Sequence, residues 1–457
     1  MKHQPIDSIN TPAAIIGAGL TGLTLAFYLK RKGIDCLLIE KEDRPGGVIH
    51  TFREQGFVYE GGPNTGVMGN REVGELFDHL EPDCKLEVAD PSAKRRLIWK
   101  SGAWHSLPSG LWEAVKTPLF TPADKLRILG EPFRRRGKDP MESVARLVRR
   151  RLGESFLDYA VDPFISGIYA GDPEMLITKY ALPKLYRLEQ EYGSFIGGAI
   201  QKRLFSSSSH PKREVFSARG GLDTLVGALA ASVGEGSFHY GASDLIVSSH
   251  KDHYQLSFSC QGRLVSIHAP VVVSTLGGHA LPGVFPFLES SWADELVSLE
   301  YAPVVQVVLG FRRWKGMPLN AFGGLVPSRE NRQVLGVLFP SSFLSGRAPA
   351  GGALLNVFLG GYKNPTCCRH PDGKLVEVVA AELKELMRLP VFAPDLVRVF
   401  RYWHAIPQYG SGSRERLRAI VSLQMRHPGL FLAGNIQEGV GMAERVAQAR
   451  RIAGLIY

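Results

Sequence analysis

The 457-residue chain contains little cysteine, and this scarcity limits the chemistry expected of it. Among its five cysteines are the adjacent Cys367 and Cys368, and no Cys/His pair has the spacing of a zinc site. We therefore expect no metal, and the thirteen histidines are interpreted as scattered surface or core residues. An odd number of cysteines without a secretory leader predicts reduced thiols and a cytoplasmic location.

The chain also has no uninterrupted apolar run long enough to span a membrane. Residues 13–29 carry no charge, but three glycines and two threonines interrupt them, and the basic residues 30–32 follow the apolar run rather than precede it. That order argues against a signal peptide. With 44% hydrophobic and 21% charged residues, the composition predicts a globular protein of two or three domains.

A glycine-rich turn near the N-terminus is the strongest motif. Gly17, Gly19 and Gly22 have GxGxxG spacing between an apolar run over 13–16, predicted to be a buried strand, and a predicted helix over 20–32. The first glycine permits a tight turn, the second lets a pyrophosphate approach the backbone, and the third lets helix and strand pack closely. The helix N-terminus would then face the phosphate with free N–H groups.

The residues after this helix complete a dinucleotide-binding pattern. Gly33 stands where a glycine commonly follows a helix, and a second apolar run, 36–39, ends on Glu40. An acid at that position binds the ribose hydroxyls of an adenine dinucleotide. A lone GxGxxG would be a weak signal, but strand, glycines, helix, second strand and acid in this order favour a Rossmann-like α/β fold over an ordinary turn.

Three more glycine-containing segments could face the same ligand. Gly46 and Gly47 close an RPGG turn, and the segment 61–65 reads GGPNT after a predicted strand over 57–60. Near the C-terminus, a predicted strand over 429–433 leads through Gly434 and Gly439–Gly441 into a last predicted helix. This second strand–glycine–helix unit is placed to bring another helix N-terminus onto the cofactor.

The net charge of +10 is concentrated in one region. Residues 94–151 hold fifteen Lys and Arg against five Asp and Glu, so the rest of the chain is formally neutral. Such a block faces nucleic acid, a membrane surface or an anionic substrate, although a solvated helix face is a serious alternative for any single cluster. No nucleic-acid-binding motif accompanies the charge, so we expect no nucleic-acid partner.

We expect this region to contact a membrane surface, because tryptophan rings favour the lipid–water interface and arginines bind lipid phosphates. We expect Trp99, Trp104 and Trp112, in a hairpin-like passage, to act as interfacial rings. The triplets Arg134–Arg136 and Arg149–Arg151, in a mostly helical stretch over 121–201, are expected to face lipid phosphates. Attachment would be peripheral, since nothing here spans the bilayer.

The remaining patterns predict a mixed sheet and a discontinuous organisation. The stretch 162–173 is expected to be a helix interrupted by Gly167 and Gly171, and Ser206–Ser209 an exposed loop. Helices are predicted over 222–233 and 374–387, and strands over 245–247, 254–258, 264–267, 271–275, 301–311 and 352–361. The expected domains are a cofactor-binding part (1–70, 211–278, 425–457), a helical basic part (94–210), and a substrate-binding part (71–93, 279–424).

These motifs together resemble the flavin-dependent amine-oxidase superfamily, and within it the oxygen-dependent protoporphyrinogen and coproporphyrinogen oxidases. The resemblance runs over nearly the whole chain, and SGIYAGDP and AIPQY are quite specific to these oxidases. The matching stretches are GAGLTGL with DRPGG near the N-terminus, GGPNT (61–65), RLIWKSGAWHSLP (96–108), SGIYAGDP (166–173), ARGGLDTLV (218–226), FGGLVPS (322–328), AIPQY (405–409) and GNIQEGVG (434–441).

The resemblance implies non-covalently bound FAD and a set of site residues. Arg96 stands where the family places an arginine near a substrate propionate, and Gly167 where a backbone carbonyl faces the porphyrinogen. The family usually has Arg-Trp where this chain has Arg401-Tyr402-Trp403, so which ring contacts the flavin stays open. The implied cofactor contacts are Gly17, Ala18, Gly19, Leu20, Thr21, Gly22, Glu40, Lys41, Gly46, Gly47, Gly62, Pro63, Asn64, Thr65, Val247, Tyr402, Val440, Gly441 and Met442.

The expected chemistry needs no catalytic triad, and no Ser/His/Asp or Cys/His set stands out. A bridging methylene carbon of the porphyrinogen would give hydride to the flavin, with O2 as final acceptor and peroxide as by-product, in three two-electron rounds. Amine oxidases usually have AGE where this chain has AGN at 433–435, and a basic block suits carboxylates better than the hydrocarbons of a carotenoid-type desaturase. A prenyl-protein escort module, the alternative without redox chemistry, is disfavoured by the intact glycine motifs. The sequence does not choose between protoporphyrinogen and coproporphyrinogen, or indicate the oligomeric state.

Overall fold

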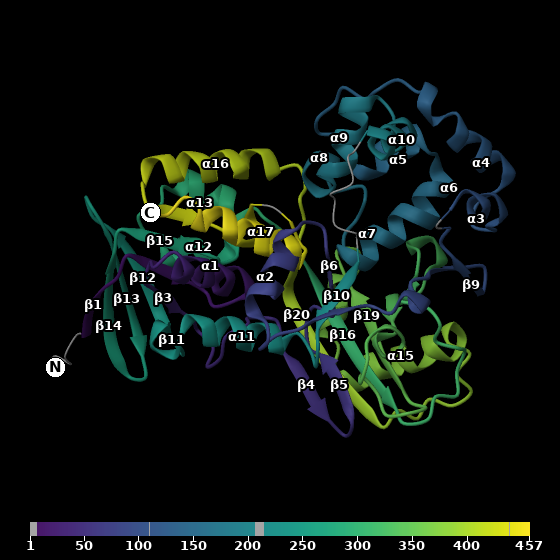
Figure 1. Ribbon diagram of the computed structural model, residues 1–457. Coiled ribbons are helices and arrows are strands. Elements are labelled where there is room, and N and C mark those ends of the chain that lie inside the picture. The colour runs from purple at the N-terminus through teal and green to yellow at the C-terminus, as the bar shows by residue number, and fades with distance from the viewer. Residues whose placement is uncertain (1–6, 109, 206–213, 438) are drawn as a thin grey trace.

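The computed structural model describes residues 7–108, 110–205, 214–437 and 439–457 (Figure 1). They form a mixed α/β fold with five sheets among the described strands. The predicted loop Ser206–Ser209 lies outside the described residues.

A parallel five-stranded sheet confirms the predicted Rossmann-like core. Its order is β11-β3-β2-β15-β21, and every neighbouring pair is parallel. Strand β15 lies between β2, from the N-terminal unit, and β21, from the C-terminal unit. The strands are β2 (Ala13–Ile16), β3 (Cys36–Ile39), β11 (Phe238–His239), β15 (Val271–Ser274) and β21 (Leu430–Leu432).

Three helices pack together against this sheet and share its core. They are α1 (Leu20–Arg31), α11 (Asp223–Val233) and α17 (Met442–Ala453), with α2 (Glu72–Leu80) against α17. Gly33 follows α1 with φ of 74°, as predicted for the residue after a helix, and donates its N–H to the Lys30 carbonyl. The two predicted strand–glycine–helix units thus lie side by side.

A four-stranded sheet follows, and its strands are longer than the sequence predicts. Its order is β1-β14-β13-β12, formed by the predicted antiparallel meander plus the N-terminal strand β1, which runs parallel to β14. The strands are β1 (Asp7–Asn10), β12 (Ser243–Ser249), β13 (Tyr254–Cys260) and β14 (Arg263–Ala269).

A seven-stranded sheet of order β20-β16-β19-β18-β17-β8-β9 forms the second large layer. Its two faces are distinct, because side chains alternate along each strand. Leu97, Val307 and Val357 face the core under α15 (Asp372–Leu386), and their neighbours face the rest of the molecule. The strands are β8 (Arg96–Lys100), β9 (Ala103–Ser106), β16 (Tyr301–Phe311), β17 (Gly323–Leu325), β18 (Val334–Leu338), β19 (Ala353–Gly360) and β20 (Leu396–Pro407).

Short elements connect these layers. Two small sheets are formed by β6 (Gly66–Val67), β7 (Leu86–Val88) and β10 (Val215–Ala218), and by β4 (Thr51–Glu54) and β5 (Phe57–Glu60). The remaining helices outside the basic region are α12 (Leu281–Val284), α13 (Ser290–Val297), α14 (Pro340–Phe343) and α16 (Ser413–Arg426).

The predicted helical stretch is a cluster of short helices at the far end of the molecule from β1 and β14 (Figure 1). Gly167 lies inside α7 and does not interrupt it, and the helix ends one residue later at Ile168. Ala170, with φ of 47°, rather than Gly171 has the left-handed conformation after the helix. The helices here are α3 (Leu111–Lys116), α4 (Pro122–Leu129), η2 (Glu131–Phe133), α5 (Val144–Arg151), α6 (Glu154–Phe156), η3 (Leu157–Val161), α7 (Asp162–Ile168), α8 (Thr178–Ala181), α9 (Pro183–Tyr192) and α10 (Phe195–Phe205).

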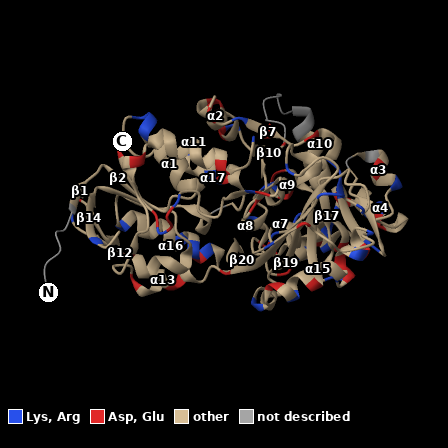
Figure 2. Ribbon diagram, turned by 90° about the horizontal axis from the view of Figure 1, so that it is seen from below, with Lys and Arg blue, Asp and Glu red and all other residues tan. Residues whose placement is uncertain are grey.

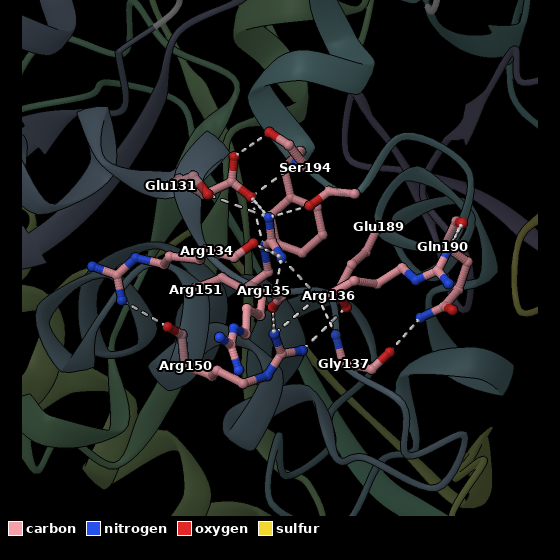
Figure 3. A network of polar contacts seen from close by, with 12 residues as sticks. Glu131, Arg134, Arg135, Arg136, Gly137, Arg150, Arg151, Glu189, Gln190 and Ser194 are labelled. Carbon is pink, nitrogen blue, oxygen red and sulfur yellow. Dashed lines mark hydrogen bonds and ion pairs between the residues drawn. The ribbon is translucent and has the colours of Figure 1, made fainter.

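The expectation that Arg149–Arg151 face lipid phosphates is wrong for Arg150 and Arg151, which pair with the buried Glu189 (Figure 3). Arg149 is partly exposed and pairs with Glu154 and Glu174 at the surface. Arg151 and Glu131 are fully buried and paired, with Arg151 Nε donating to Glu131 Oε1 at 2.6 Å. Arg151 Nη1 also lies 2.8 Å from Glu189 Oε1. A buried guanidinium must be paired and hydrogen-bonded, so this network holds helices together rather than contacting lipid.

Glu131 also binds the start of α10. Its carboxylate accepts hydrogen bonds from Ser194 Oγ at 2.6 Å and from the Phe195 and Ile196 N–H groups at 3.0 and 3.1 Å. Burial on its own would raise the pKa of Glu131, but these donors and Arg151 outweigh burial and lower it. The carboxylate is therefore ionised at neutral pH and caps the helix.

Two of the three tryptophans are also internal. Trp99 is buried, its ring meets that of Trp104 edge-on at 5.1 Å, and Trp104 Nε1 donates to the Leu386 carbonyl at 2.5 Å. Both rings pack under the seven-stranded sheet, so the expectation that they lie at a membrane interface is wrong for them. Only Trp112 of the three is well exposed, at 80% of its surface.

We predict that Arg151→Met destabilises the protein by about 3–5 kcal/mol, because it leaves the buried Glu131 carboxylate without its ion-pair partner, whereas Glu189 keeps Arg150. Urea unfolding measures the change. The control is Arg146→Met, which removes an exposed pair with Asp139 (3.7 Å) that is worth at most about 1 kcal/mol. Equal effects of the two substitutions would contradict the structural role of Arg151.

Candidate cofactor and substrate site

The first glycine turn has the shape that a pyrophosphate needs. A Cβ atom at Gly22 would lie 2.0 Å from the Gly17 carbonyl oxygen, so only glycine fits where α1 crosses the turn. Gly19 precedes α1 and has open space where its side chain would be. A ligand can therefore approach the backbone at Gly19, and Leu20 and Thr21 begin the helix with their side chains buried.

Glu40 lies at the end of β3 and contacts this turn. Its carboxylate accepts hydrogen bonds from the Ala18 N–H at 2.7 Å and from the Glu42 N–H at 3.0 Å. A carboxylate accepts about four hydrogen bonds, so capacity is left for ribose hydroxyls. Lys41, by contrast, is exposed and pairs with Glu42 at 3.4 Å.

The RPGG turn lies directly beside the first glycine turn. Gly46 donates its N–H to the Ala18 carbonyl at 2.8 Å and forms a bridge with Gly19. A Cβ at Gly47 would lie 3.4 Å from the Gly19 Cα. The structure thus brings Gly46 and Gly47 together with Gly19, although the three glycines belong to separate motifs in the sequence.

The GGPNT turn joins the cofactor side to the seven-stranded sheet. Gly62 cannot be replaced, because a Cβ there would lie 2.0 Å from the Val48 carbonyl oxygen. Asn64 Nδ2 donates to the Gly62 carbonyl at 3.1 Å, and Asn64 Oδ1 accepts from Asn356 Nδ2 on β19. Tyr402 on β20 donates its hydroxyl to the Gly61 carbonyl. Pro63 and Thr65 are half-buried in the same turn.

Tyr402 and Trp403 point to opposite sides of β20, as neighbours on a strand must. Burial raises the pKa of Tyr402 to about 12, with Arg44 acting in the opposite direction, so its hydroxyl stays a donor at neutral pH. Trp403 is exposed over half its surface. Of the two rings, Tyr402 lies on the side of the GGPNT turn.

A buried carboxylate also fixes this region. Glu60 accepts from Thr51 Oγ1 at 2.7 Å, from Arg347 Nη1 at 2.9 Å and from the Leu222 N–H at 3.1 Å. Burial raises the pKa of Glu60, and the Thr51 and Arg347 contacts act in the opposite direction. Because Arg347 precedes β19 and Leu222 precedes α11, this carboxylate ties the two large layers together.

The second glycine unit lies at the same sheet edge as the first. Gly434 follows β21 with φ of 85°, and Gly441 precedes α17, whose first residue, Met442, is buried. Val440 is half-buried just before it. Because β2 and β21 flank β15 in parallel, the N-termini of α1 and α17 meet at one edge.

Val247 differs from the other implied cofactor contacts. Its side chain is fully buried in the core between the five-stranded and four-stranded sheets. It lies on β12, an edge strand of its sheet, so only its backbone is placed to meet an adenine.

One face of the seven-stranded sheet brings the substrate-side residues together. The strand registers place Arg96, Gly323, Leu338 and Asn356 in one row across four strands. The next row on the same face contains Ile98, Leu325, Gly336, Phe358 and Gln306. On this face, Arg96 lies on β8 toward one end of the sheet, and Asn356, which contacts Asn64 of the GGPNT turn, lies on β19 near the middle.

Gly167 is brought to the same face by α7. A Cβ at Gly167 would lie 2.3 Å from Leu325 Cδ2, so the helix touches the sheet where glycine is required. Its carbonyl is one of the last in α7, and the Gly171 N–H, the donor expected for it, bonds to the Ile165 carbonyl at 3.3 Å instead. The Gly167 carbonyl is therefore available to a ligand.

Arg96 is an exposed cation at the start of β8. Its guanidinium lies 5.9 Å from the centre of the Phe322 ring. No carboxylate of the described residues forms an ion pair with it, so a negatively charged ligand would meet no competitor within that part of the chain.

Sequence reasoning missed Asn356, which lies in the run LLNVFLG of β19 and is fully buried. A single amide within an apolar strand is the signal that could have found it, because a buried amide requires a partner. That partner, Asn64, lies in a motif remote in sequence, and only the fold pairs them.

Comparison with known proteins shows the family to which this chain belongs. A model of the flavin containing amine oxidoreductase family matches residues 20–456, so the chain belongs to this family. The chloroplastic protoporphyrinogen oxidase of Nicotiana tabacum is 31% identical over 96% of this chain and 84% of its own. The coproporphyrinogen III oxidase of Bacillus subtilis (strain 168) is 25% identical, covering 95% of this chain and 96% of its own.

Solved structures share the fold at lower identity. A crystal structure from Exiguobacterium sp. 255-15, provisionally named protoporphyrinogen oxidase, has a TM-score of 0.81 at 23% identity and covers 99% of both chains. Putrescine oxidase bound to putrescine has a TM-score of 0.70 at 14% identity, with 98% of this chain and 99% of that chain covered. These likenesses establish the architecture.

Family membership makes the chain an FAD-dependent oxidoreductase. The glycine turns fit this cofactor, because open space at Gly19 and the hydrogen-bonding carboxylate of Glu40 lie at the edge where α1 and α17 begin.

We predict that Glu40→Ala weakens FAD binding by roughly 1.5–3 kcal/mol, the range for a hydrogen bond to a charged group. Titration of the apoprotein with FAD, followed by flavin fluorescence, measures the change. Glu42→Ala is the control, because Glu42 is exposed and its side chain pairs only with Lys41 among the ion pairs of the described residues. Unchanged affinity in Glu40→Ala would remove it from the site.

Proposed function

We propose that the protein oxidises a porphyrinogen to a porphyrin in porphyrin and heme biosynthesis, with FAD as cofactor and O2 as acceptor. This proposal rests on one observation: Arg96 and Asn356 lie on the same face of the seven-stranded sheet, and Asn356 contacts the GGPNT turn. The names of the relatives, which include protoporphyrinogen and coproporphyrinogen oxidases, support it.

The proposed roles of the residues follow from their positions. The apolar side chains of Leu325 and Phe358, with Gly336 between them, would pack against a flat macrocycle and exclude water. The Gly167 carbonyl would accept a hydrogen bond from the macrocycle, and Arg96 would bind a propionate. Tyr402 and Asn64 would hold the turn beside the cofactor.

The chemistry that FAD would supply when bound is acceptance of hydride from a bridging carbon in each of three rounds, with one O2 reduced to hydrogen peroxide per round. The chain's own part is to position the macrocycle and keep the site dry. The pyrrole proton passes to solvent or a weak base, so no strong base is needed.

The test is oxidation of both porphyrinogens by the FAD-loaded protein, followed by porphyrin fluorescence and oxygen consumption. Formation of porphyrin from either one supports the proposal, and the faster substrate identifies whether two or four propionates are preferred. If neither is oxidised while a primary amine is, the protein is an amine oxidase instead.

We predict that Arg96→Ala raises KM for the porphyrinogen more than it lowers kcat, because a propionate contact exists in ground and transition states alike. Steady-state kinetics measure both constants. Arg95→Ala is a matched control, since Arg95 instead hydrogen-bonds the Asn320 carbonyl at 3.1 and 3.2 Å. Kinetics unaltered by Arg96→Ala, or altered equally by both, would remove Arg96 from the site.

We further propose a cytoplasmic location with peripheral attachment to an anionic membrane surface. Five exposed apolar side chains on α3, α4 and η2 are here called the apolar ridge. Helices α3 and α4 lie at one end of the molecule (Figure 2). Exposed basic residues Lys116, Arg127 and Arg135 lie near them in sequence. None of the helices in the described ranges has the length and apolarity to cross a bilayer. The apolar ridge consists of Trp112, Val115, Leu126, Leu129 and Phe133.

The apolar ridge, rather than the buried tryptophans and the paired arginines, is thus the candidate membrane contact. Phe133 is 90% exposed and Trp112 80%, which is unusual for rings of this size. Each basic residue near an anionic leaflet adds about 1 kcal/mol, so a few are enough for reversible binding. Poorly soluble anionic substrates would benefit from an entrance near such a surface.

We predict salt-sensitive sedimentation with phosphatidylserine-containing vesicles, at low but not at high ionic strength. Replacing Trp112 and Phe133 by serine should reduce the bound fraction several-fold, because the rings supply the apolar contact. Val391→Ser, an exposed apolar residue outside the ridge, is the control. A protein that stays in the supernatant at low salt would show that the basic region serves substrate or solubility.

A further inference from the structure

Tyr409, in the AIPQY motif, touches the second glycine unit. It follows β20, and only 3% of its surface is exposed. Its hydroxyl lies 2.8 Å from the Asn435 carbonyl oxygen and 3.1 Å from the Gly439 carbonyl oxygen. Both carbonyls belong to the described segments 434–437 and 439–441, together called the cofactor loop below, which lie between β21 and α17. The one proton of this buried hydroxyl is thus shared between two carbonyls of the loop in a bifurcated hydrogen bond.

Two further buried side chains hold the same loop. Arg416 on α16 donates from Nε to the Ile436 carbonyl at 3.1 Å, and its guanidinium lies 5.7 Å from the centre of the Tyr409 ring. Gln448 on α17 accepts from the Gly434 N–H at 2.9 Å. Burial lowers the pKa of Arg416, with nearby Tyr409 acting in the opposite direction. Buried polar contacts therefore hold the loop, together with the apolar packing of Ile436 and Val440.

The contact with Gly439 also orients the next N–H group. In a planar trans peptide, the carbonyl and the following N–H point in opposite directions. Because Tyr409 binds the Gly439 carbonyl, the Val440 N–H points away from Tyr409. Within the described part of the chain, no acceptor takes this N–H. It lies two residues before α17, whose N-terminus adjoins that of α1 at the sheet edge.

We propose that Tyr409 is a positioning residue for the cofactor: it orients the 439–440 peptide so that the Val440 N–H is presented to FAD. Tyr409 does not touch the reacting atoms and acts only through the loop. The inference rests on the flavin cofactor that family membership establishes, and it holds whichever substrate is oxidised. Arg416 supports it by holding the Tyr409 ring and the middle of the loop.

The test removes only the hydroxyl, in Tyr409→Phe. We expect FAD to bind the apoprotein about 3- to 10-fold more weakly, since a net hydrogen bond is worth about that factor. The flavin absorption bands should also shift, because displacing the Val440 N–H changes the hydrogen bonding of the bound flavin. Fluorescence titration with FAD and the visible spectrum of the loaded protein measure the two effects, and neither uses a porphyrinogen.

Tyr254→Phe is a matched control. Tyr254 is exposed to the same 3%, and its hydroxyl donates to the Pro428 carbonyl at 2.9 Å, at the other end of β21 from the cofactor loop. Both variants should lower the melting temperature of the apoprotein to a similar extent. Only Tyr409→Phe should change FAD affinity and the flavin spectrum.

Two outcomes would overturn the proposal. One is unchanged FAD affinity and spectrum in Tyr409→Phe, and the other is an equal loss of affinity in both variants, which would indicate a general structural effect. If Tyr409→Phe does not fold, Arg416→Met is measured instead, because it removes the contact with Ile436. Weaker FAD binding in that variant supports the proposal, and unchanged binding refutes it. Failure to oxidise porphyrinogens would leave all these results intact, so the two proposals fail separately.

Discussion

The structure depends on the parallel pairing of β15 with both β2 and β21. Parallel strands end at a common edge, so this pairing brings two glycine turns from opposite ends of the chain to one place. The helices that follow, α1 and α17, pack on each other and start at that edge. The candidate dinucleotide site is therefore made from the two ends of the chain and is discontinuous in sequence.

The second constraint is the small number of polar contacts that join this site to the seven-stranded sheet. Asn64 meets Asn356, Tyr402 donates to the GGPNT turn, and Glu60 pairs with Arg347. Each is buried or half-buried among apolar residues, where a lost partner would be costly. Directional contacts of this kind fix how the sheet face is oriented toward the cofactor, which apolar packing leaves less well defined.

The arginines of the basic region have different roles, which a count of charges along the sequence does not distinguish. Arg151 stabilises the helical cluster from inside, Arg149 and Arg150 pair with glutamates, and Arg96 remains free of ion pairs with described residues. Arg135 is exposed near the apolar ridge. Carboxylates close in space but distant in sequence decide which arginines are neutralised, so the surplus of charge does not show where a ligand or membrane is contacted.

The sequence by itself determined the elements whose causes are local. Strands 13–16 and 36–39, the helix after Gly19, the meander and the C-terminal unit follow from apolar runs and glycine spacing, and the structure confirms them. Only the tertiary structure decided what depends on distant partners: the burial of Trp99, the Asn64–Asn356 contact, and the row that sets Arg96 on one face with Asn356. Periodicity and turn geometry are properties of neighbouring residues, whereas burial, charge pairing and the assembly of a site depend on which segments the fold brings together.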